Sequence, residues 1–133
     1  MADNSLKSFE DLRCWQACRE VRIFITELIK NYPKVEQYSI VDNMKRAARS
    51  TTQNIAEGFG RFHYKENLQF CRISRGSLFE LTDDLITSID EGFIKKEDYE
   101  LGRKKISNAL ALLNGYIKYL NSKANPQTSH YNY

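Results

Sequence analysis

Four long stretches of this chain carry apolar residues at alternating intervals of three and four, and this periodicity constrains the fold most. In the first stretch, Cys14, Cys18, Val21, Ile25 and Leu28 follow one another at intervals of four, three, four and three. Such a stripe lies along one face of an α-helix and packs against stripes on neighbouring helices. Only 6 glycines and 2 prolines occur in 133 residues, so few positions disfavour helix. The predicted helices span 9–31, 39–57, 64–91 and 96–122.

Short connections separate the four predicted helices, and their length indicates the topology. Connections of a few residues place consecutive helices side by side and in opposite directions. We therefore expect an all-α chain that folds as an antiparallel up-down-up-down four-helix bundle over residues 9–122. Residues 1–8 are expected to form a flexible N-terminus, and residues 123–133 a disordered C-terminal tail.

Capping residues and glycines mark the predicted helix ends. In a capping box, two residues three positions apart each accept, through the side chain, a hydrogen bond from the other's backbone N–H. The spacing of this motif occurs at Ser8–Asp11 and again at Ser39–Asp42. Gly58 or Gly60 is expected to end the second helix in the left-handed conformation that glycine tolerates. Gly92 is expected to do the same for the third helix.

Hydropathy and cysteine content indicate where such a protein functions. No apolar run approaches the ~18–20 residues that a membrane span needs, and the polar start of the chain lacks a signal-peptide core. We therefore expect a cytoplasmic protein without membrane contact. The three cysteines, Cys14, Cys18 and Cys71, are expected to be reduced and buried. Because neither histidine is near them in the sequence, we expect no metal site and no cofactor.

Residue patterns that carry catalysis are not evident. Ser50 and Ser77 have no base adjacent in the sequence that would activate a hydroxyl nucleophile. Asp83 and Asp84 are neighbours, so their carboxylates diverge on a helix. The spacing of glutamate and histidine that builds a di-iron site in a bundle does not occur. The sequence therefore predicts a protein that is not an enzyme.

Positive charge is concentrated in the middle of the chain. The net charge is +3, whereas the window 45–75 holds seven Lys or Arg and two Glu, which gives +5. Such a window predicts a phosphate-binding face, and a merely solvated helical face is the alternative interpretation. Because no groove-reading motif or aromatic stacking platform is evident, nucleic-acid binding is expected to be non-specific. The candidate phosphate-binding residues are Lys45, Arg49, Arg61, Lys65, Arg72 and Arg75.

A polar face runs along the second predicted helix. Arg46, Ser50 and Glu57 lie at positions i, i+4 and i+11, which fall on one side. We expect this face to meet the outer face of the third helix, within the chain or between subunits. Glu80 or Glu57 would supply a carboxylate there, and Arg46 or Arg49 a guanidinium, in a pair that fixes the register. The candidate structural residues are Arg46, Ser50, Asn54, Glu57, Gly58, Gly76, Ser77 and Glu80.

The polar face also carries a recognisable motif. Residues 46–61 read RAARSTTQNIAEGFGR, and residues 75–81 read RGSLFEL. The first segment resembles the proteins encoded by intervening sequences in bacterial 23S ribosomal RNA genes, and the second resembles their third helix. The resemblance extends over about residues 9–120. Thr51 departs from the family pattern, which usually has isoleucine at this position.

The resemblance implies a four-helix bundle that assembles as a homopentamer. A related branch, the accessory protein of diversity-generating retroelements, forms a basic pentameric barrel that associates with a reverse transcriptase and with nucleic acid. We therefore expect a non-enzymatic scaffold or accessory protein. Its expected partners are copies of itself and RNA, DNA or a nucleic-acid enzyme such as a reverse transcriptase. The alternative is a purely structural, self-assembling protein that binds no nucleic acid.

Overall fold

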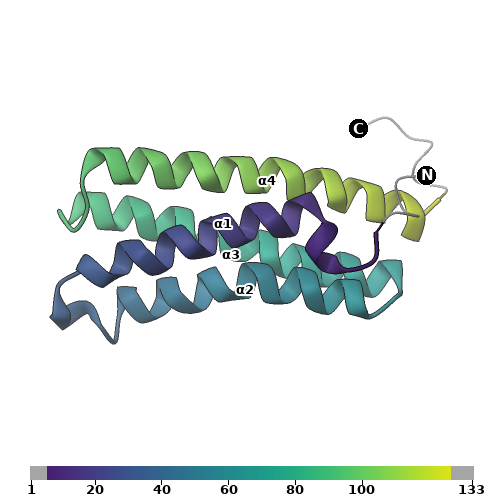
Figure 1. Cartoon of the computed structure of the whole chain (residues 1–133), viewed down its shortest axis with the longest axis horizontal. Helices are drawn as coiled ribbons and strands as arrows, with labels where there is room; N and C mark the ends of the chain where they lie inside the picture. Colours follow the sequence, from purple (N-terminus) through teal and green to yellow (C-terminus); the bar gives the residue numbers. More distant parts are fainter. Residues whose placement is uncertain (1–5, 127–133) are drawn as a thin grey trace.

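The computed structural model describes residues 6–126, which form helices joined by short connections (Figure 1). No strand occurs within these residues, and the all-α prediction is confirmed. The described part of the chain contains three short 3-10 helices and four long α-helices. In chain order the elements are η2 (Phe9–Asp11), α1 (Arg13–Leu28), η3 (Ile29–Asn31), η4 (Lys34–Glu36), α2 (Ile40–Gly60), α3 (Tyr64–Asp90) and α4 (Lys96–Ala124).

Each long helix packs against two others, so that α1, α2, α3 and α4 surround a shared interior. Hydrogen bonds between α2 and α3 join Asn43 to Asp84 and Ser50 to Ser77. The two helices therefore run in opposite directions along this contact. Figure 1 shows the chain turning back at each connection between long helices. This arrangement places the motif-bearing faces of α2 and α3 next to each other.

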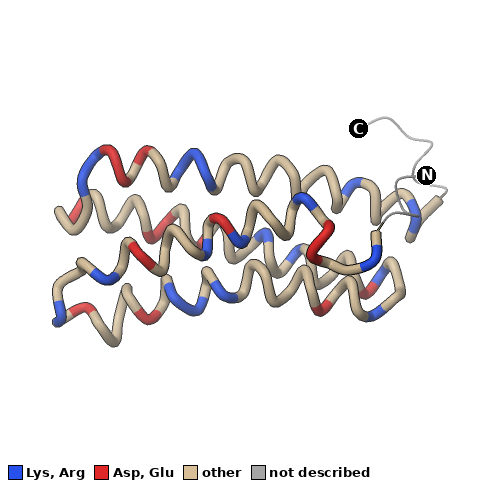
Figure 2. The backbone as a smooth tube through the Cα atoms, in the orientation of Figure 1, with Lys and Arg blue, Asp and Glu red and all other residues tan. Residues whose placement is uncertain are grey.

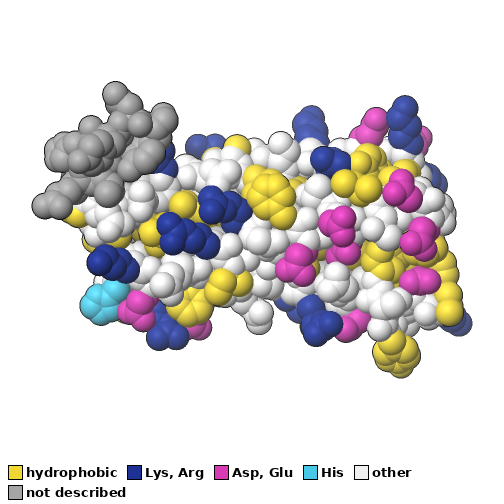
Figure 3. Space-filling model, turned by 180° about the vertical axis from the view of Figure 1, so that it is seen from behind, with side chains coloured by type: hydrophobic (Ala, Val, Ile, Leu, Met, Phe, Trp, Pro, Cys, Tyr) yellow, Lys and Arg dark blue, Asp and Glu magenta, His cyan; other side chains and the backbone are white. Residues whose placement is uncertain are grey.

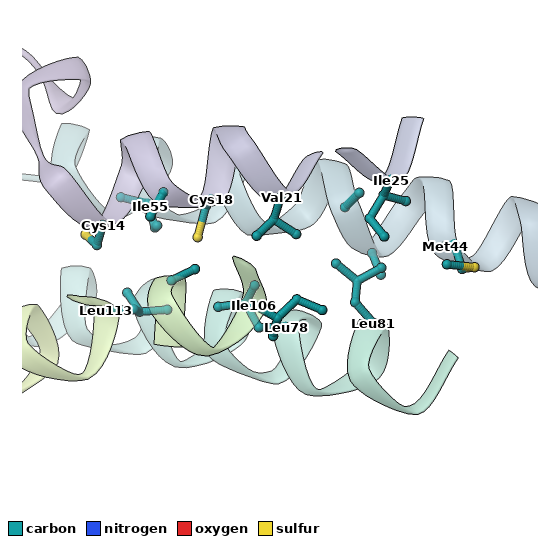
Figure 4. Close-up of a cluster of buried hydrophobic side chains, with 14 of the residues drawn as sticks. Cys14, Cys18, Val21, Ile25, Met44, Ile55, Leu78, Leu81, Ile106 and Leu113 are labelled. Atoms are coloured by element: carbon teal, nitrogen blue, oxygen red, sulfur yellow. The ribbon is translucent and has the colours of Figure 1, made fainter. Parts of the chain in front are cut away.

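The interior is built from the stripes that the periodicity predicted. Figure 4 shows side chains of all four helices pointing toward one another. Removing such apolar side chains from water provides the main driving force for packing the helices together. The residues labelled there are Cys14, Cys18, Val21 and Ile25 of α1, Met44 and Ile55 of α2, Leu78 and Leu81 of α3, and Ile106 and Leu113 of α4, all of them buried.

The first predicted helix is divided in the structure. The capping box is present: the Ser8 Oγ accepts from the Glu10 N–H at 3.2 Å, and the Ser8 N–H donates to Asp11 Oδ2 at 3.2 Å. It caps the short η2 rather than α1, because Leu12 is extended, with φ −73° and ψ 126°. The predicted helix start at residue 9 was therefore wrong for α1, which begins at Arg13.

Both ends of α2 differ from the prediction. Ser39 makes no capping hydrogen bond to α2; its Oγ donates to the Glu36 side chain instead, at 2.8 Å. At the other end, Gly58 lies inside the helix and Gly60 is its last residue, and neither has the positive φ that was predicted. The residue with positive φ is Phe62, at 61°.

The end of α3 follows the prediction. Gly92 has a φ of 78°, its N–H donates to the Ile89 carbonyl at 3.2 Å, and the Phe93 N–H donates to the Ser88 carbonyl at 2.8 Å. These two bonds form a Schellman motif, which satisfies carbonyl groups at a helix end. The role predicted for Gly92 is confirmed.

The predicted tails lie largely outside the described residues. Of the N-terminal segment 1–8, the structure describes Leu6, which packs against the core, together with Lys7 and Ser8. Helix α4 extends to Ala124, two residues beyond its predicted end at 122. Residues 127–133 of the predicted tail are not described. No helix within residues 6–126 has the length and apolar character needed to cross a bilayer.

Candidate nucleic-acid interface

The six basic residues predicted to bind phosphate lie at three separate places. Lys45 and Arg49 border a hollow on the side of α2 that faces α1. Arg61 lies at the turn between α2 and α3. The structure therefore does not bring the six into one patch. The remaining three, all on α3, are Lys65, Arg72 and Arg75.

The charge of Arg61 is balanced by its neighbours. Its Nε lies 3.0 Å from Glu57 Oε2, and its Nη1 lies 3.7 Å from Glu66 Oε2. The guanidinium also lies over the Phe70 ring, 5.1 Å from the ring centre. A phosphate would have to compete with two carboxylates here, so Arg61 is the least available of the six.

The basic residues of α3 form a row on its outer side. Lys65 and Arg72 are exposed and form no ion pair within residues 6–126. Arg75 is half-buried, and its Nη1 donates to Asn114 Oδ1 at 3.0 Å. Figures 2 and 3 show basic residues along α3 on the half of the molecule nearer the grey chain ends. Lys65 and Arg72 are therefore the readily accessible cations of this row, and Arg75 is partly covered.

Polar side chains of the motif form a seam between α2 and α3. The Ser77 hydroxyl donates to Ser50 Oγ at 2.8 Å, and the Asn54 amide donates to the same oxygen at 2.9 Å. Ser50 and Ser77 are partly or fully shielded from water, where a satisfied hydrogen bond is favoured over an unpaired group. The seam therefore specifies one register of α2 against α3.

The ion pair predicted across this seam is not formed within residues 6–126. Arg46 instead pairs with Asp42, with Nη2 and Oδ2 3.2 Å apart, and Glu57 pairs with Arg61. Both pairs join residues one helical turn apart, where long side chains meet easily. Arg46 and Glu80 nevertheless border the same hollow beside Ser50 and Ser77.

Gly58 allows α2 to approach α3 closely. A Cβ at this buried position would lie 2.6 Å from Asn67 Oδ1 and 3.0 Å from Phe70 Cβ. Asn67 is itself fixed, because its amide donates to the Tyr116 hydroxyl at 3.0 Å. Gly76, by contrast, is exposed and has open space where a Cβ would be. The packing of the bundle therefore requires glycine at position 58 but not at position 76.

Asp84 is a buried carboxyl group whose role the sequence analysis missed. It is only 8% exposed and accepts a hydrogen bond from the Asn43 amide at 2.9 Å. Burial raises the pKa of Asp84 to about 6; the Asn43 hydrogen bond opposes this effect, and the carboxylates of Asp83 and Glu80 add to it. Its position three residues after the core residue Leu81 was the available signal, because that spacing points inward.

We expect stability to fall as pH rises past the pKa of Asp84. Between pH 3.8, where a free carboxyl ionises, and about 6, the folded state holds a proton that the unfolded state has lost, so the free energy of unfolding decreases with pH. Asp84→Asn should therefore increase the free energy of unfolding by about 3 kcal/mol at pH 8 and change it little at pH 4. Urea unfolding at both values measures this. The exposed control Glu100→Gln should show no such difference, and equal effects of Asp84→Asn at both pH values would contradict the assignment.

An aromatic hollow at the α2–α3 turn was not foreseen from the sequence. It has a volume of about 250 Å³, and the rings of Tyr116 and Tyr119 are stacked, with centres 6.2 Å apart. Phe62 is 87% exposed, in a left-handed conformation that is rare for a bulky residue. Aromatic rings are the side chains on which nucleobases stack. The aromatic residues of the hollow are Phe59, Phe62, Tyr64, Tyr116 and Tyr119.

The cysteines are buried free thiols. Burial raises the pKa of Cys18 to about 11 and that of Cys71 to about 12. Both thiols are therefore protonated at neutral pH and are poor nucleophiles. Within residues 6–126, no group of three or more His, Cys, Asp or Glu side chains is arranged to hold a metal ion.

The helices of the bundle match a known protein family over most of their length. Residues 10–115 match the family described as 23S rRNA-intervening sequence protein. This range contains α1, α2, α3 and most of α4. The chain belongs to this family. The predicted resemblance to the 23S rRNA-intervening sequence proteins is thereby confirmed. The relation to the accessory protein of diversity-generating retroelements stays a prediction. No curated protein matches the chain.

Proposed function

We propose that this 23S rRNA-intervening sequence protein is a non-enzymatic, self-associating scaffold or accessory protein of the cytoplasm that binds nucleic-acid backbones non-specifically. Its helices form an antiparallel up-down-up-down bundle, which the oppositely numbered contacts of α2 and α3 support. The observation that carries the nucleic-acid proposal is the row on α3, where Lys65 and Arg72 are exposed and pair with no acidic group in the described part of the chain.

Binding to such a row would be electrostatic. Each lysine or arginine that neutralises a phosphate releases condensed counterions, and this release favours binding at low salt irrespective of sequence. One row of three cations binds weakly. Self-association, for which the family resemblance implies a pentamer, would present several rows to one strand and raise the overall affinity without new contacts. RNA and DNA both fit this interaction.

Neutralising the α3 row is expected to weaken RNA binding and its salt dependence. In single-stranded RNA, each phosphate contact contributes about 0.7 to the slope of log affinity against log salt concentration. The triple variant Lys65→Gln, Arg72→Gln and Arg75→Gln should therefore reduce this slope by about two. Fluorescence anisotropy of a labelled RNA strand, titrated at several salt concentrations, measures both quantities.

The control for this variant removes the same charge elsewhere. Lys95 lies just before α4, Lys96 begins it and Lys104 lies in its third turn, and all three are exposed. Their replacement by glutamine should leave the slope almost unchanged. Equal losses in both triple variants would mean that net charge alone governs binding. A wild-type protein that binds no RNA even at low salt would overturn the proposal.

The alternative function is a purely structural, self-assembling protein. The pairing of Arg61 with Glu57 and Glu66 favours it, because one predicted phosphate ligand is already neutralised. The salt titration distinguishes the two functions, since a structural protein would show no RNA binding that depends on the α3 row.

A further inference from the structure

The aromatic hollow lies at the end of the bundle where the basic row on α3 begins. Tyr64, which lines the hollow, is the first residue of α3, and Lys65 follows it directly. Figure 1 shows the C-terminal part of α4 at the same end of the molecule as the turn between α2 and α3. The Lys123 ammonium of α4 lies 5.8 Å from the centre of the Tyr119 ring. The hollow is thus flanked by one lysine from α3 and one from α4.

Two of the rings that line the hollow are open to water. Phe62 is 87% exposed and Tyr64 is 47% exposed. Phe62 also has a φ of 61°, a conformation that costs a bulky residue free energy and that is found most often where a protein binds a ligand. A ring with so little buried surface contributes little to the stability of the bundle, so the packing of the helices does not explain this residue.

The inner wall of the hollow is held in place by the bundle. Phe59, Tyr116 and Tyr119 are partly buried and pack against the core. Asn67, which is only 7% exposed, donates to the Tyr116 hydroxyl at 3.0 Å and accepts from the Cys71 thiol at 3.4 Å. The volume of about 250 Å³ lies below the ~300–1,000 Å³ of pockets that hold drug-sized ligands. The hollow therefore suits a single flat ring system.

We propose that the aromatic hollow binds one unpaired base of a single-stranded nucleic acid whose phosphates lie along the α3 row. The base stacks on the Phe62 ring, and the phosphates on either side of it meet Lys65 and Lys123. Aromatic rings combined with a track of cations are the means by which proteins bind single strands without sequence preference. Every base has a π-face to stack, and Asn67 is already engaged within the protein, so the hollow recognises a base without selecting its identity.

The inference rests on the proposed nucleic-acid binding and narrows its ligand to single strands. In a duplex each base is paired and stacked between its neighbours, so it reaches such a hollow only if it is flipped out at a cost in free energy. A duplex should therefore contact the α3 row alone, and its affinity should not depend on Phe62. Because the hollow lies at one end of the bundle, a bound base leaves the long sides of the helices open to further copies of the chain.

An abasic strand provides the test, because it keeps the phosphates of an ordinary strand and lacks the bases. At low salt, the wild-type chain should bind a labelled oligothymidine strand at least about fivefold more tightly than an abasic DNA strand of the same length, which is the contribution of one stacked base. Phe62→Ala should weaken binding of the oligothymidine strand by a similar factor and leave binding of the abasic strand unchanged. Fluorescence anisotropy of each labelled strand measures the four dissociation constants.

Two controls accompany Phe62→Ala. Phe62→Tyr keeps a ring at this position and should bind both strands as the wild type does. Tyr38→Ala removes a ring that is 95% exposed, in the connection before α2 at the opposite end of the bundle, and should change neither affinity. Because Phe62 is so exposed, we expect Phe62→Ala to fold, which circular dichroism checks; Phe62→Leu is a second variant without a ring and should behave in the same way.

The possible outcomes separate this inference from the proposed function. Equal binding of both strands by the wild type would overturn the stacking hollow and retain the phosphate-binding row. A preference for oligothymidine that persists in Phe62→Ala would also overturn it, because the bases would then stack elsewhere. The same would follow if Phe62→Ala weakened binding of a duplex as much as that of the single strand. A wild-type chain that binds neither strand at low salt would overturn both proposals.

Discussion

Leu113→Ala is expected to lower the free energy of unfolding by about 2–5 kcal/mol. Leu113 is fully buried, and Figure 4 shows it among the side chains that α4 directs into the interior. Truncation removes apolar contacts and leaves a cavity that the helices of the bundle fill only partly. The midpoint of urea unfolding, followed by circular dichroism, measures the change.

The control for this substitution is Leu101→Ala on the same helix. Leu101 is 45% exposed, so its truncation removes little buried surface and should cost well under about 1 kcal/mol. If Leu113→Ala destabilised the protein no more than Leu101→Ala, the shared interior of the four helices would be wrong. A variant that does not fold at all would agree with the prediction, and Leu113→Met would then give a measurable, smaller loss.

Gly58→Ala is expected to destabilise the protein by about 1–3 kcal/mol, although alanine favours helix. The added Cβ would lie 2.6 Å from Asn67 Oδ1 and 3.0 Å from the Asn67 carbonyl oxygen, so the seam between α2 and α3 must open or shift. Forcing atoms into a well-packed interface costs more than the helix preference of alanine returns. Urea unfolding of the variant measures the difference.

Gly115→Ala is the matched control, because Gly115 lies inside α4 with open space where its Cβ would be. There the helix preference acts alone and should stabilise the protein by about 0.5–1 kcal/mol. The two glycine substitutions should therefore have opposite signs. Stabilisation by both would show that α2 and α3 do not approach as closely at Gly58 as the structure has it.

The helices were largely predictable from the sequence because their stripes are long. For α3, the predicted range 64–91 differs by one residue from the observed Tyr64–Asp90. The break in the helix at Leu12 was harder to predict, because Ser8 and Asp11 satisfy the capping pattern for a short helix as well as for a long one. Local patterns identify a helix start but not how far the helix continues.

Gly58 shows how tertiary packing can override a local signal. A glycine after a helical stripe usually ends the helix, and the prediction followed that rule. The approach of Asn67 and Phe70 requires glycine at this position for a different reason. Those two residues belong to another helix, so a reading of α2 alone does not reveal the requirement.

The candidate site was predictable only in part. A basic stretch of sequence does not reveal which side of the bundle each of its side chains lies on. The window 45–75 is basic, but Lys45 and Arg49 lie toward α1, away from the row on α3. The neutralisation of Arg61 was predictable, because Glu57 precedes it by four residues and oppositely charged side chains at this spacing pair readily on helices. The aromatic hollow was not, because its rings come from distant parts of the chain.

The central claim is that the bundle associates with itself and presents cations to nucleic acid. Light scattering of the full chain, with and without a single-stranded RNA, tests it most directly. We expect a particle mass that is a multiple of the 15.6 kDa chain and that increases when RNA is added at low salt, with the increase reversed by high salt. A particle that stays at 15.6 kDa at every concentration, with RNA and without it, would contradict the claim.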